Sequence, residues 1–75
     1  MEKNMGSFQL SDGGPVLEYN DSEITIVGSE KKGFFGGEWK VKYKLPSNPN
    51  VTQTFGVSKN TSGVTIGSIR IKVHK

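Results

Sequence analysis

The strongest constraint on the fold is a strict alternation of apolar and basic side chains between residues 38 and 45. Trp39, Val41 and Tyr43 occupy the odd positions, and lysines occupy the even positions 40, 42 and 44. Side chains of a β-strand point alternately to its two faces. This segment is therefore predicted to be a strand with one buried face and one solvated, basic face.

Similar alternation recurs along the chain, with turn residues between the segments. Ten glycines and three prolines interrupt it, and no longer stretch has the periodicity of a helix. The predicted strands span residues 7–10, 15–19, 22–28, 38–45, 51–57 and 64–75. The second and third of these, joined by Asn20-Asp21, are predicted to form a β-hairpin.

The last predicted strand changes its buried face partway along. Apolar residues fall at even positions up to Ile66 and at odd positions from Ile69 onward. A strand changes faces only where an extra residue is inserted. We therefore favour a β-bulge or sharp bend at Gly67-Ser68 within one strand. The alternative is a turn at Gly67-Ser68 between two shorter strands.

These strands predict an all-β fold, a small antiparallel meander of five to six short strands curled into a small barrel or a two-layer sandwich. The 75 residues are expected to form a single domain, with residues 1–6 disordered. Cysteine is absent, which excludes disulfides and thiolate metal sites. Because so short a chain buries only a thin core, self-association is an option for stabilising it.

Neither a membrane span nor a signal peptide is predicted. No run of apolar residues approaches the length that crosses a bilayer, and the first six residues lack the apolar run of a signal peptide. A soluble protein in the cytoplasm is therefore expected.

No constellation of residues predicts catalysis. The one histidine, His74, is one residue from the C-terminus, where chains fray and catalytic geometry is hard to hold. Glu18, Glu23 and Glu38 are interpreted as solvated carboxylates on strand faces. The glycine patterns of nucleotide-binding loops and the acidic spacing of calcium loops are absent. We predict no catalytic residue, no metal and no cofactor.

Charge is distributed unevenly along the chain. Residues 1–30 carry six acidic and one basic side chain, a net −5, whereas residues 31–75 carry nine basic and one acidic, a net +8. If the two basic strands are neighbours or flank the strand between them, their lysines and arginine form one cationic patch. The alternative is that these charges pair with the acidic strands. The candidate binding residues on this surface are Lys40, Lys42, Lys44, Arg70 and Lys72.

The segment 31–37 joins the acidic and basic parts and contains two adjacent phenylalanines. Neighbouring side chains on a strand point to opposite faces, so Phe34 and Phe35 cannot both enter a one-sided core. Exposed aromatic side chains beside Lys31 and Lys32 suit the anchoring of a protein partner, the stacking of bases or contact with a membrane surface. The alternative is that one phenylalanine closes an open end of the sheet while the other is shielded by the loop.

Two functional hypotheses follow from these features. The first is a non-catalytic β module that binds another protein, including a second copy of itself, through the Gly/Phe-rich loop 31–37 and the adjacent charged surface. The second is a nucleic-acid-binding protein that uses the basic strand face. The sequence implies no small-molecule substrate.

Overall fold

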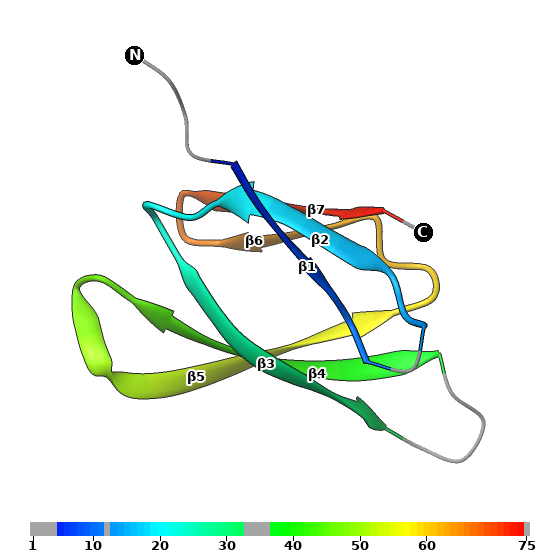
Figure 1. Cartoon of the computed structure of the whole chain (residues 1–75). Coiled ribbons are helices and arrows are strands. Elements are labelled where there is room, and N and C mark those ends of the chain that lie inside the picture. The colour runs from blue at the N-terminus through cyan, green and yellow to red at the C-terminus, as the bar shows by residue number, and fades with distance from the viewer. Residues whose placement is uncertain (1–4, 12, 33–36, 75) are drawn as a thin grey trace.

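The alternation of apolar side chains sorts the strands into two layers, with their apolar faces turned toward each other (Figure 1). The computed structural model describes residues 5–11, 13–32 and 37–74. The strands are β1 (Met5–Gln9), β2 (Val16–Asn20), β3 (Thr25–Lys32), β4 (Glu38–Leu45), β5 (Asn48–Ser58), β6 (Gly63–Ile66) and β7 (Ile69–His74). One sheet has four strands in the order β1-β2-β7-β6, and the other has three in the order β3-β4-β5.

The core lies between the two sheets and is built by the apolar rows that the alternation predicts. On β4, the side chains of Trp39, Val41 and Tyr43 are buried, whereas the lysines between them are half-exposed. The buried core residues are Leu10, Leu17, Tyr19, Ile24, Trp39, Val41, Tyr43, Val57, Ile71 and Val73. Each sheet contributes its inner row, as expected for a sandwich.

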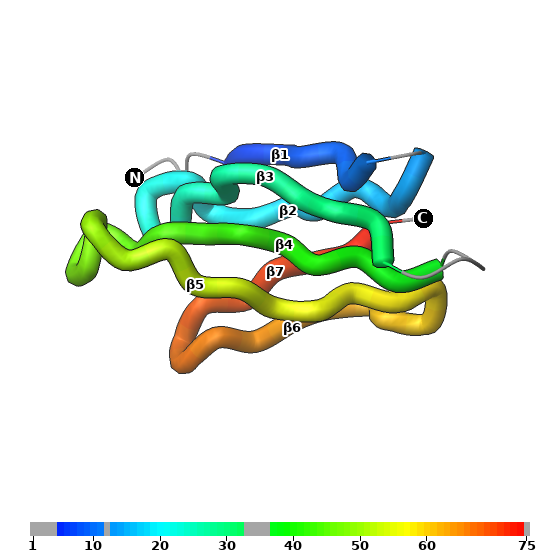
Figure 2. Tube along the Cα trace, turned by 90° about the horizontal axis from the view of Figure 1, so that it is seen from below, coloured from blue at the N-terminus to red at the C-terminus, as the bar shows by residue number. Residues whose placement is uncertain are grey.

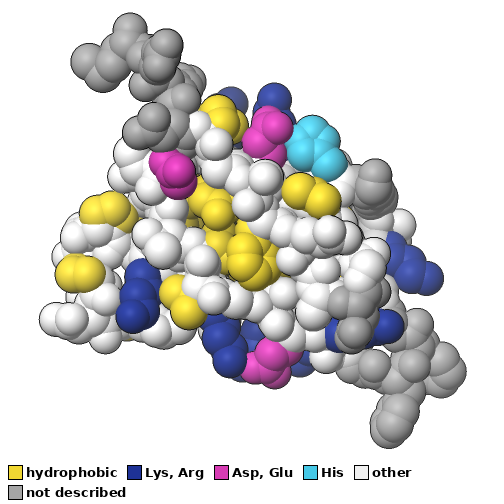
Figure 3. All heavy atoms as spheres, in the orientation of Figure 1, with side chains coloured by type: hydrophobic (Ala, Val, Ile, Leu, Met, Phe, Trp, Pro, Cys, Tyr) yellow, Lys and Arg dark blue, Asp and Glu magenta, His cyan; other side chains and the backbone are white. Residues whose placement is uncertain are grey.

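The fold is a two-layer sandwich rather than a closed barrel. Seen from below, β3 runs along the same side as β1, and β5 along the same side as β6 (Figure 2). Hydrophobic side chains are visible at the surface between β1 and β3 (Figure 3), where Phe8 and Ile26 are only half-buried. Of the two predicted architectures, the structure has the sandwich.

The predicted hairpin between residues 15–19 and 22–28 is wrong. β2 pairs with β1 and β7, whereas β3 pairs with β4. The chain crosses from one sheet to the other between Asn20 and Thr25, and the Ile24 side chain is fully buried in this crossing. Both strands place their apolar rows in the same core because they lie in opposite layers.

The preferred bend at Gly67-Ser68 is also wrong, and the alternative turn is correct. Ile66 pairs with Ile69, so Gly67 and Ser68 form a two-residue hairpin loop between β6 and β7. Gly67 has φ of 60°, which suits the first central position of a type II′ turn. Because the chain reverses direction here, both apolar rows lie on the same inner face. The division of this segment explains why seven strands are present where five to six were expected.

Several strands are longer than predicted. β5 begins at Asn48 because only Pro46 and Ser47 form the turn after β4. β3 continues to Lys32, with a β-bulge at Val27 between the paired residues Ile26 and Gly28. β1 begins at Met5, so residues 5 and 6, which were expected to be disordered, belong to the four-stranded sheet.

Candidate functional site

Two connections and the ends of two strands lie at one end of the sandwich, which we call the loop end (Figure 1). They are the β1–β2 connection, the β5–β6 connection, the last residues of β3 and the first residues of β4. The β3–β4 connection contains Phe34 and Phe35, and residues 33–36 lie outside the described residues. The candidate site is therefore built from the described residues on either side of this segment.

Trp39 fixes the position of the loop end. It is the second residue of β4 and is only 7% exposed. Its indole Nε1 donates a hydrogen bond of 2.8 Å to the carbonyl oxygen of Ser11 in the β1–β2 connection. The backbone N–H of Ser11 in turn donates to Oγ of Ser29 on β3. These two bonds tie the four-stranded sheet to the three-stranded sheet.

Gly14 allows the β1–β2 connection to lie directly against the indole. A Cβ atom placed on Gly14 would lie 2.7 Å from Trp39 Cε2 and 2.9 Å from Leu10 Cβ. Carbon atoms in contact are normally about 3.5–4.0 Å apart. Glycine is therefore required at this position for the observed packing.

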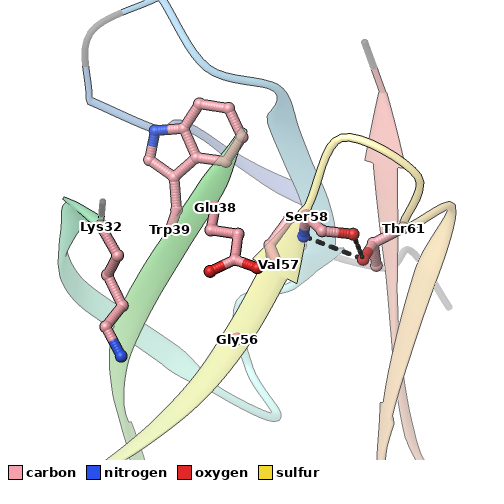
Figure 4. A pocket seen from close by; sticks show the side chains of 7 residues that line it. All are labelled: Lys32, Glu38, Trp39, Gly56, Val57, Ser58 and Thr61. Atoms are coloured by element: carbon pink, nitrogen blue, oxygen red, sulfur yellow. Dashed lines mark hydrogen bonds between the residues drawn. The ribbon is translucent and has the colours of Figure 1, made fainter. Parts of the chain in front are cut away.

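A first hollow of about 350 Å³ opens beside Trp39, at the end of the three-stranded sheet (Figure 4). Lys32 and Glu38 pair directly across β3 and β4. Figure 4 shows the Trp39 indole turned away from both side chains, as alternation along a strand requires. The residues that line this hollow are Lys32, Glu38, Trp39, Gly56, Val57, Ser58 and Thr61.

The far wall of the first hollow is a turn held by its own side chains. The backbone N–H of Ser58 donates to Oγ1 of Thr61 at 2.9 Å, and the two hydroxyl groups are 3.0 Å apart. The N–H of Thr61 donates to the carbonyl oxygen of Ser58 at 3.1 Å. The β5–β6 connection therefore presents two hydroxyl groups in a defined geometry.

A second hollow of about 300 Å³ is also lined by Trp39, and its lining consists mainly of apolar atoms. Its residues are Gly13, Gly14, Pro15, Trp39 and Lys59. The N–H of Lys59 donates a bond of 2.8 Å to the carbonyl oxygen of Gly37. A Cβ on Gly37, which has φ of 84°, would lie 2.8 Å from Lys59 Cε. The lysine stem therefore packs against the first described residue after the segment 33–36.

Two of the predicted loop residues lie in the described part of the chain, and one of them lines a hollow. Lys31 and Lys32 are exposed at the end of β3, and Lys32 lines the first hollow. Phe34 and Phe35 lie outside the described residues. Sequence reasoning placed Trp39 in the core, which is correct. It missed that Gly14, Lys59 and Thr61 converge on this tryptophan from connections distant in the sequence.

The predicted basic residues do not form one cationic patch. Lys40, Lys42 and Lys44 lie on β4 of the three-stranded sheet, whereas Arg70 and Lys72 lie on β7 of the four-stranded sheet. Each row is on the side of its strand away from the core. The two rows therefore occupy opposite outer faces of the sandwich, because β4 and β7 belong to different layers.

One side chain on each outer face, Lys42 on β4 and His74 on β7, lies close to an acidic side chain of a neighbouring strand. Nζ of Lys42 is 2.8 Å from Oε1 of Glu30 on β3, and Nε2 of His74 is 3.7 Å from Oε2 of Glu18 on β2. The hydrogen bond and charge of Lys42 lower the pKa of the Glu30 carboxyl below its usual 4.5. The alternative in which basic residues pair with the acidic strands is thus correct for Lys42 and Glu30.

Within residues 5–11, 13–32 and 37–74, no group of three or more histidine, cysteine or carboxylate side chains could hold a metal ion. The same residues contain no helix that is long and apolar enough to span a bilayer. Comparison with protein families, with curated proteins and with solved structures finds no match to the chain.

Proposed function

We propose that the chain is a non-catalytic module that binds another protein through its loop end. The observation that carries this proposal is the pair of hollows that Trp39 lines. One is also lined by Lys32, just before the segment that contains Phe34 and Phe35, and the other by Lys59, whose backbone bonds to Gly37 just after it. Hollows of this size accommodate individual side chains, and interfaces commonly seat a few large anchors in such pockets.

The base of the proposed site is held in place before any partner arrives. One hydrogen bond fixes the Trp39 indole to the β1–β2 connection, and a backbone hydrogen bond fixes Lys59 to Gly37. A surface that does not rearrange loses less conformational entropy on binding. We assign the anchoring role to Phe34 and Phe35, and the steering of an acidic partner to Lys31 and Lys32.

The test is affinity capture from an extract of host cells treated with nuclease. Replacing both anchors, Phe34→Ala with Phe35→Ala, is expected to abolish recovery of the partner while the melting temperature of the domain stays close to that of the unmodified chain. The matched control is Met5→Ala with Val27→Ala, which removes two exposed apolar side chains elsewhere. Recovery of the same partner by the double phenylalanine variant would show that the loop is not the anchor.

Nucleic-acid binding is the second candidate, and the outer face of the three-stranded sheet is the observation that favours it. Lys40, Lys42 and Lys44 run along its central strand, and a Cβ on Gly28 or Gly56 of the flanking strands would meet no atom within 4 Å. This gives a flat basic surface that suits a phosphate backbone. The aromatic side chains of β4 and β5 are turned toward the core, which leaves this face without a platform for base stacking.

Titration of labelled single-stranded and duplex oligonucleotides at two salt concentrations tests this candidate. Binding through lysines is expected to weaken steeply with salt, since each neutralised phosphate releases counterions. Replacing the three β4 lysines by glutamine is expected to remove binding, whereas Arg70→Gln with Lys72→Gln on the opposite face leaves it intact. Absence of binding at low salt would eliminate the candidate.

The expected cytoplasmic location stays a prediction.

A further inference from the structure

A third hollow, of about 210 Å³, opens at the end of the sandwich opposite the loop end. The β2–β3 crossing and the β6–β7 turn both lie at this end (Figure 1, Figure 2). The residues that line the hollow are Met5 of β1, Asn20 at the end of β2, Glu23 of the crossing, Ser68 of the turn and Arg70 of β7. Four segments that are distant in the sequence therefore converge on it.

Three of these residues form one row across the outer face of the four-stranded sheet. Met5 pairs with Asn20 across β1 and β2, and Glu18 pairs with Lys72 across β2 and β7. Continuing the second register by two residues along each strand brings Asn20 opposite Arg70, on the same face as the Glu18–Lys72 pair. The apolar side chain of Met5 and the guanidinium of Arg70 thus lie on either side of Asn20.

The polar wall of the hollow is held by bonds within the crossing. The N–H of Glu23 donates to the carbonyl oxygen of Asn20 at 3.0 Å. The side-chain oxygen of Asn20 accepts from the N–H and the hydroxyl of Ser22, at 3.0 and 2.6 Å. Because these bonds use the amide oxygen, the amide nitrogen of Asn20 remains available as a donor. A wall that is already ordered loses less conformational entropy when a ligand binds.

Arg70 and Glu23 bring opposite charges to the hollow without pairing with each other. Within residues 5–11, 13–32 and 37–74, the ion pairs are those of Lys42 with Glu30 and of His74 with Glu18, and neither includes a residue of this hollow. A guanidinium group only donates hydrogen bonds, and a carboxylate only accepts them. A small ligand that carries both an anionic and a cationic group satisfies both side chains at once.

We infer that this hollow binds a free α-amino acid with an apolar side chain. The carboxylate of the ligand accepts from the Arg70 guanidinium, with the Asn20 amide and the Ser68 hydroxyl as further donors, and its ammonium group donates to Glu23. The apolar side chain of the ligand packs against Met5, which is 53% exposed and adapts its shape readily. Sites for drug-sized ligands measure about 300–1,000 Å³, so the smaller hollow suits a ligand whose two charges share one carbon atom.

The test is a titration of the unmodified chain with L-leucine, followed by two-dimensional NMR of the backbone amides. Saturable shifts are expected at the five lining residues, with a dissociation constant in about the millimolar range, as suits a small ligand in an open hollow. Two matched probes separate the charges. Isocaproate lacks the ammonium group of leucine and isoamylamine lacks its carboxylate, and each is expected to bind about fivefold more weakly or less tightly still.

Single substitutions assign each charge to its side chain. Glu23→Gln is expected to weaken leucine binding about fivefold and to leave isocaproate binding no weaker, whereas Arg70→Gln is expected to weaken leucine and isocaproate alike. The matched controls are Glu18→Gln and Lys72→Gln, an acid and a base that pair on the same outer face but do not line the hollow. They are expected to leave leucine binding unchanged. Melting temperatures check that each variant is folded.

The inference is overturned if leucine gives no saturable shift, if the three probes bind equally, or if Lys72→Gln weakens binding as much as Arg70→Gln does. The hollow shares no residue with those that Trp39 lines. Leucine is therefore expected to bind equally well to the Phe34→Ala, Phe35→Ala variant. Loss of partner capture and loss of leucine binding are thus separate results, and a failure here does not bear on the function proposed for the loop end.

Discussion

The two ends of the sandwich are held together in different ways. At the loop end, the connections bond to one another and across the sheets: Trp39 donates to Ser11, and Lys59 donates to Gly37. At the opposite end, which we call the hairpin end, the crossing from β2 to β3 is held by bonds within itself. There the Asn20 side chain accepts from both the N–H and the hydroxyl of Ser22.

This difference indicates that the loop end behaves as one unit and the hairpin end as separate turns. Residues that share a contact or a hydrogen-bond network are expected to couple energetically, whereas distant residues contribute independently. The single tryptophan of the chain lies at the loop end, so its fluorescence reports on that end. A substitution at the hairpin end that alters Trp39 emission would therefore reveal coupling between the two ends.

The largest effect is expected for Trp39→Ala. The side chain is 7% exposed and reaches from β4 to Ser11 and Gly14 in the β1–β2 connection. Truncation of a buried tryptophan typically costs about 3–5 kcal/mol, and here it also leaves the Ser11 carbonyl without its indole donor. Urea denaturation followed by circular dichroism measures the loss. A cost below about 1 kcal/mol would mean that the tryptophan does not hold the two sheets together.

A smaller but related effect is expected for Gly14→Ala. The added Cβ would overlap the indole ring and Leu10, and overpacking of this kind costs about 1–3 kcal/mol. The emission of Trp39 is expected to shift, because the ring must move. Gly56→Ala on β5 is the control: its Cβ meets nothing within 4 Å, so stability is expected to stay the same or rise slightly. Equal destabilisation by both variants would contradict the packing seen at Gly14.

At the hairpin end, Gly67→Ala is expected to cost about 1–2 kcal/mol for a different reason. Space is free around this residue, but its φ of 60° is costly for any residue with a Cβ. Because the strain is confined to one turn, Trp39 emission in the folded state is expected to be unchanged. Ser68→Ala, in the same loop, should be close to neutral. A change in Trp39 emission in the Gly67→Ala variant would show that the hairpin end and the loop end are coupled, and would contradict the view that the turns of the hairpin end are independent.

Local patterns in the sequence were sufficient to predict where strands lie, but not that residues 64–75 contain two of them. The alternation from Trp39 to Tyr43 correctly predicts which face of β4 is buried. The turn at Gly67-Ser68 was present only as the less favoured alternative, because a bulge and a hairpin both reverse the apolar register. The bulge and the hairpin differ in whether the residues before Gly67 pair with those after Ser68. The periodicity of apolar residues carries no information about such pairing.

The assignment of strands to sheets could not be predicted, because it depends on contacts between distant segments. The basic residues Lys42 and Lys72 have the same local pattern, yet β4 and β7 lie in different layers. The candidate site also depends on contacts between segments that are distant in the sequence. Lys32 belongs to a segment that the sequence singled out. Gly14 and Thr61 line the hollows beside Trp39 only because the β1–β2 and β5–β6 connections pack at this end of the sandwich.

The smallest predicted effect concerns the titration of Tyr19, at the hairpin end. Its side chain is buried against Gly6. Burial raises the pKa of the Tyr19 hydroxyl above its ordinary value of 10.0, and the negative charge of Asp21 in the adjoining turn raises it further. The folded state therefore favours the neutral phenol. Its contribution to stability is complete at pH values below 10 and is lost as the pH rises through the higher pKa of the folded state.

Asp21→Asn removes the smaller of the two causes, so the pKa of Tyr19 should fall toward 10.0 and remain above it. Ultraviolet absorbance of the tyrosinate measures this in a Tyr43→Phe background, in which Tyr19 is the remaining tyrosine. Because Asp21 belongs to a turn that bonds only within itself among the described residues, the substitution should leave Trp39 emission and the Ser11 contact unchanged. A pKa that does not move would assign the whole shift to burial. A simultaneous change at Trp39 would mean that the hairpin end is coupled to the loop end.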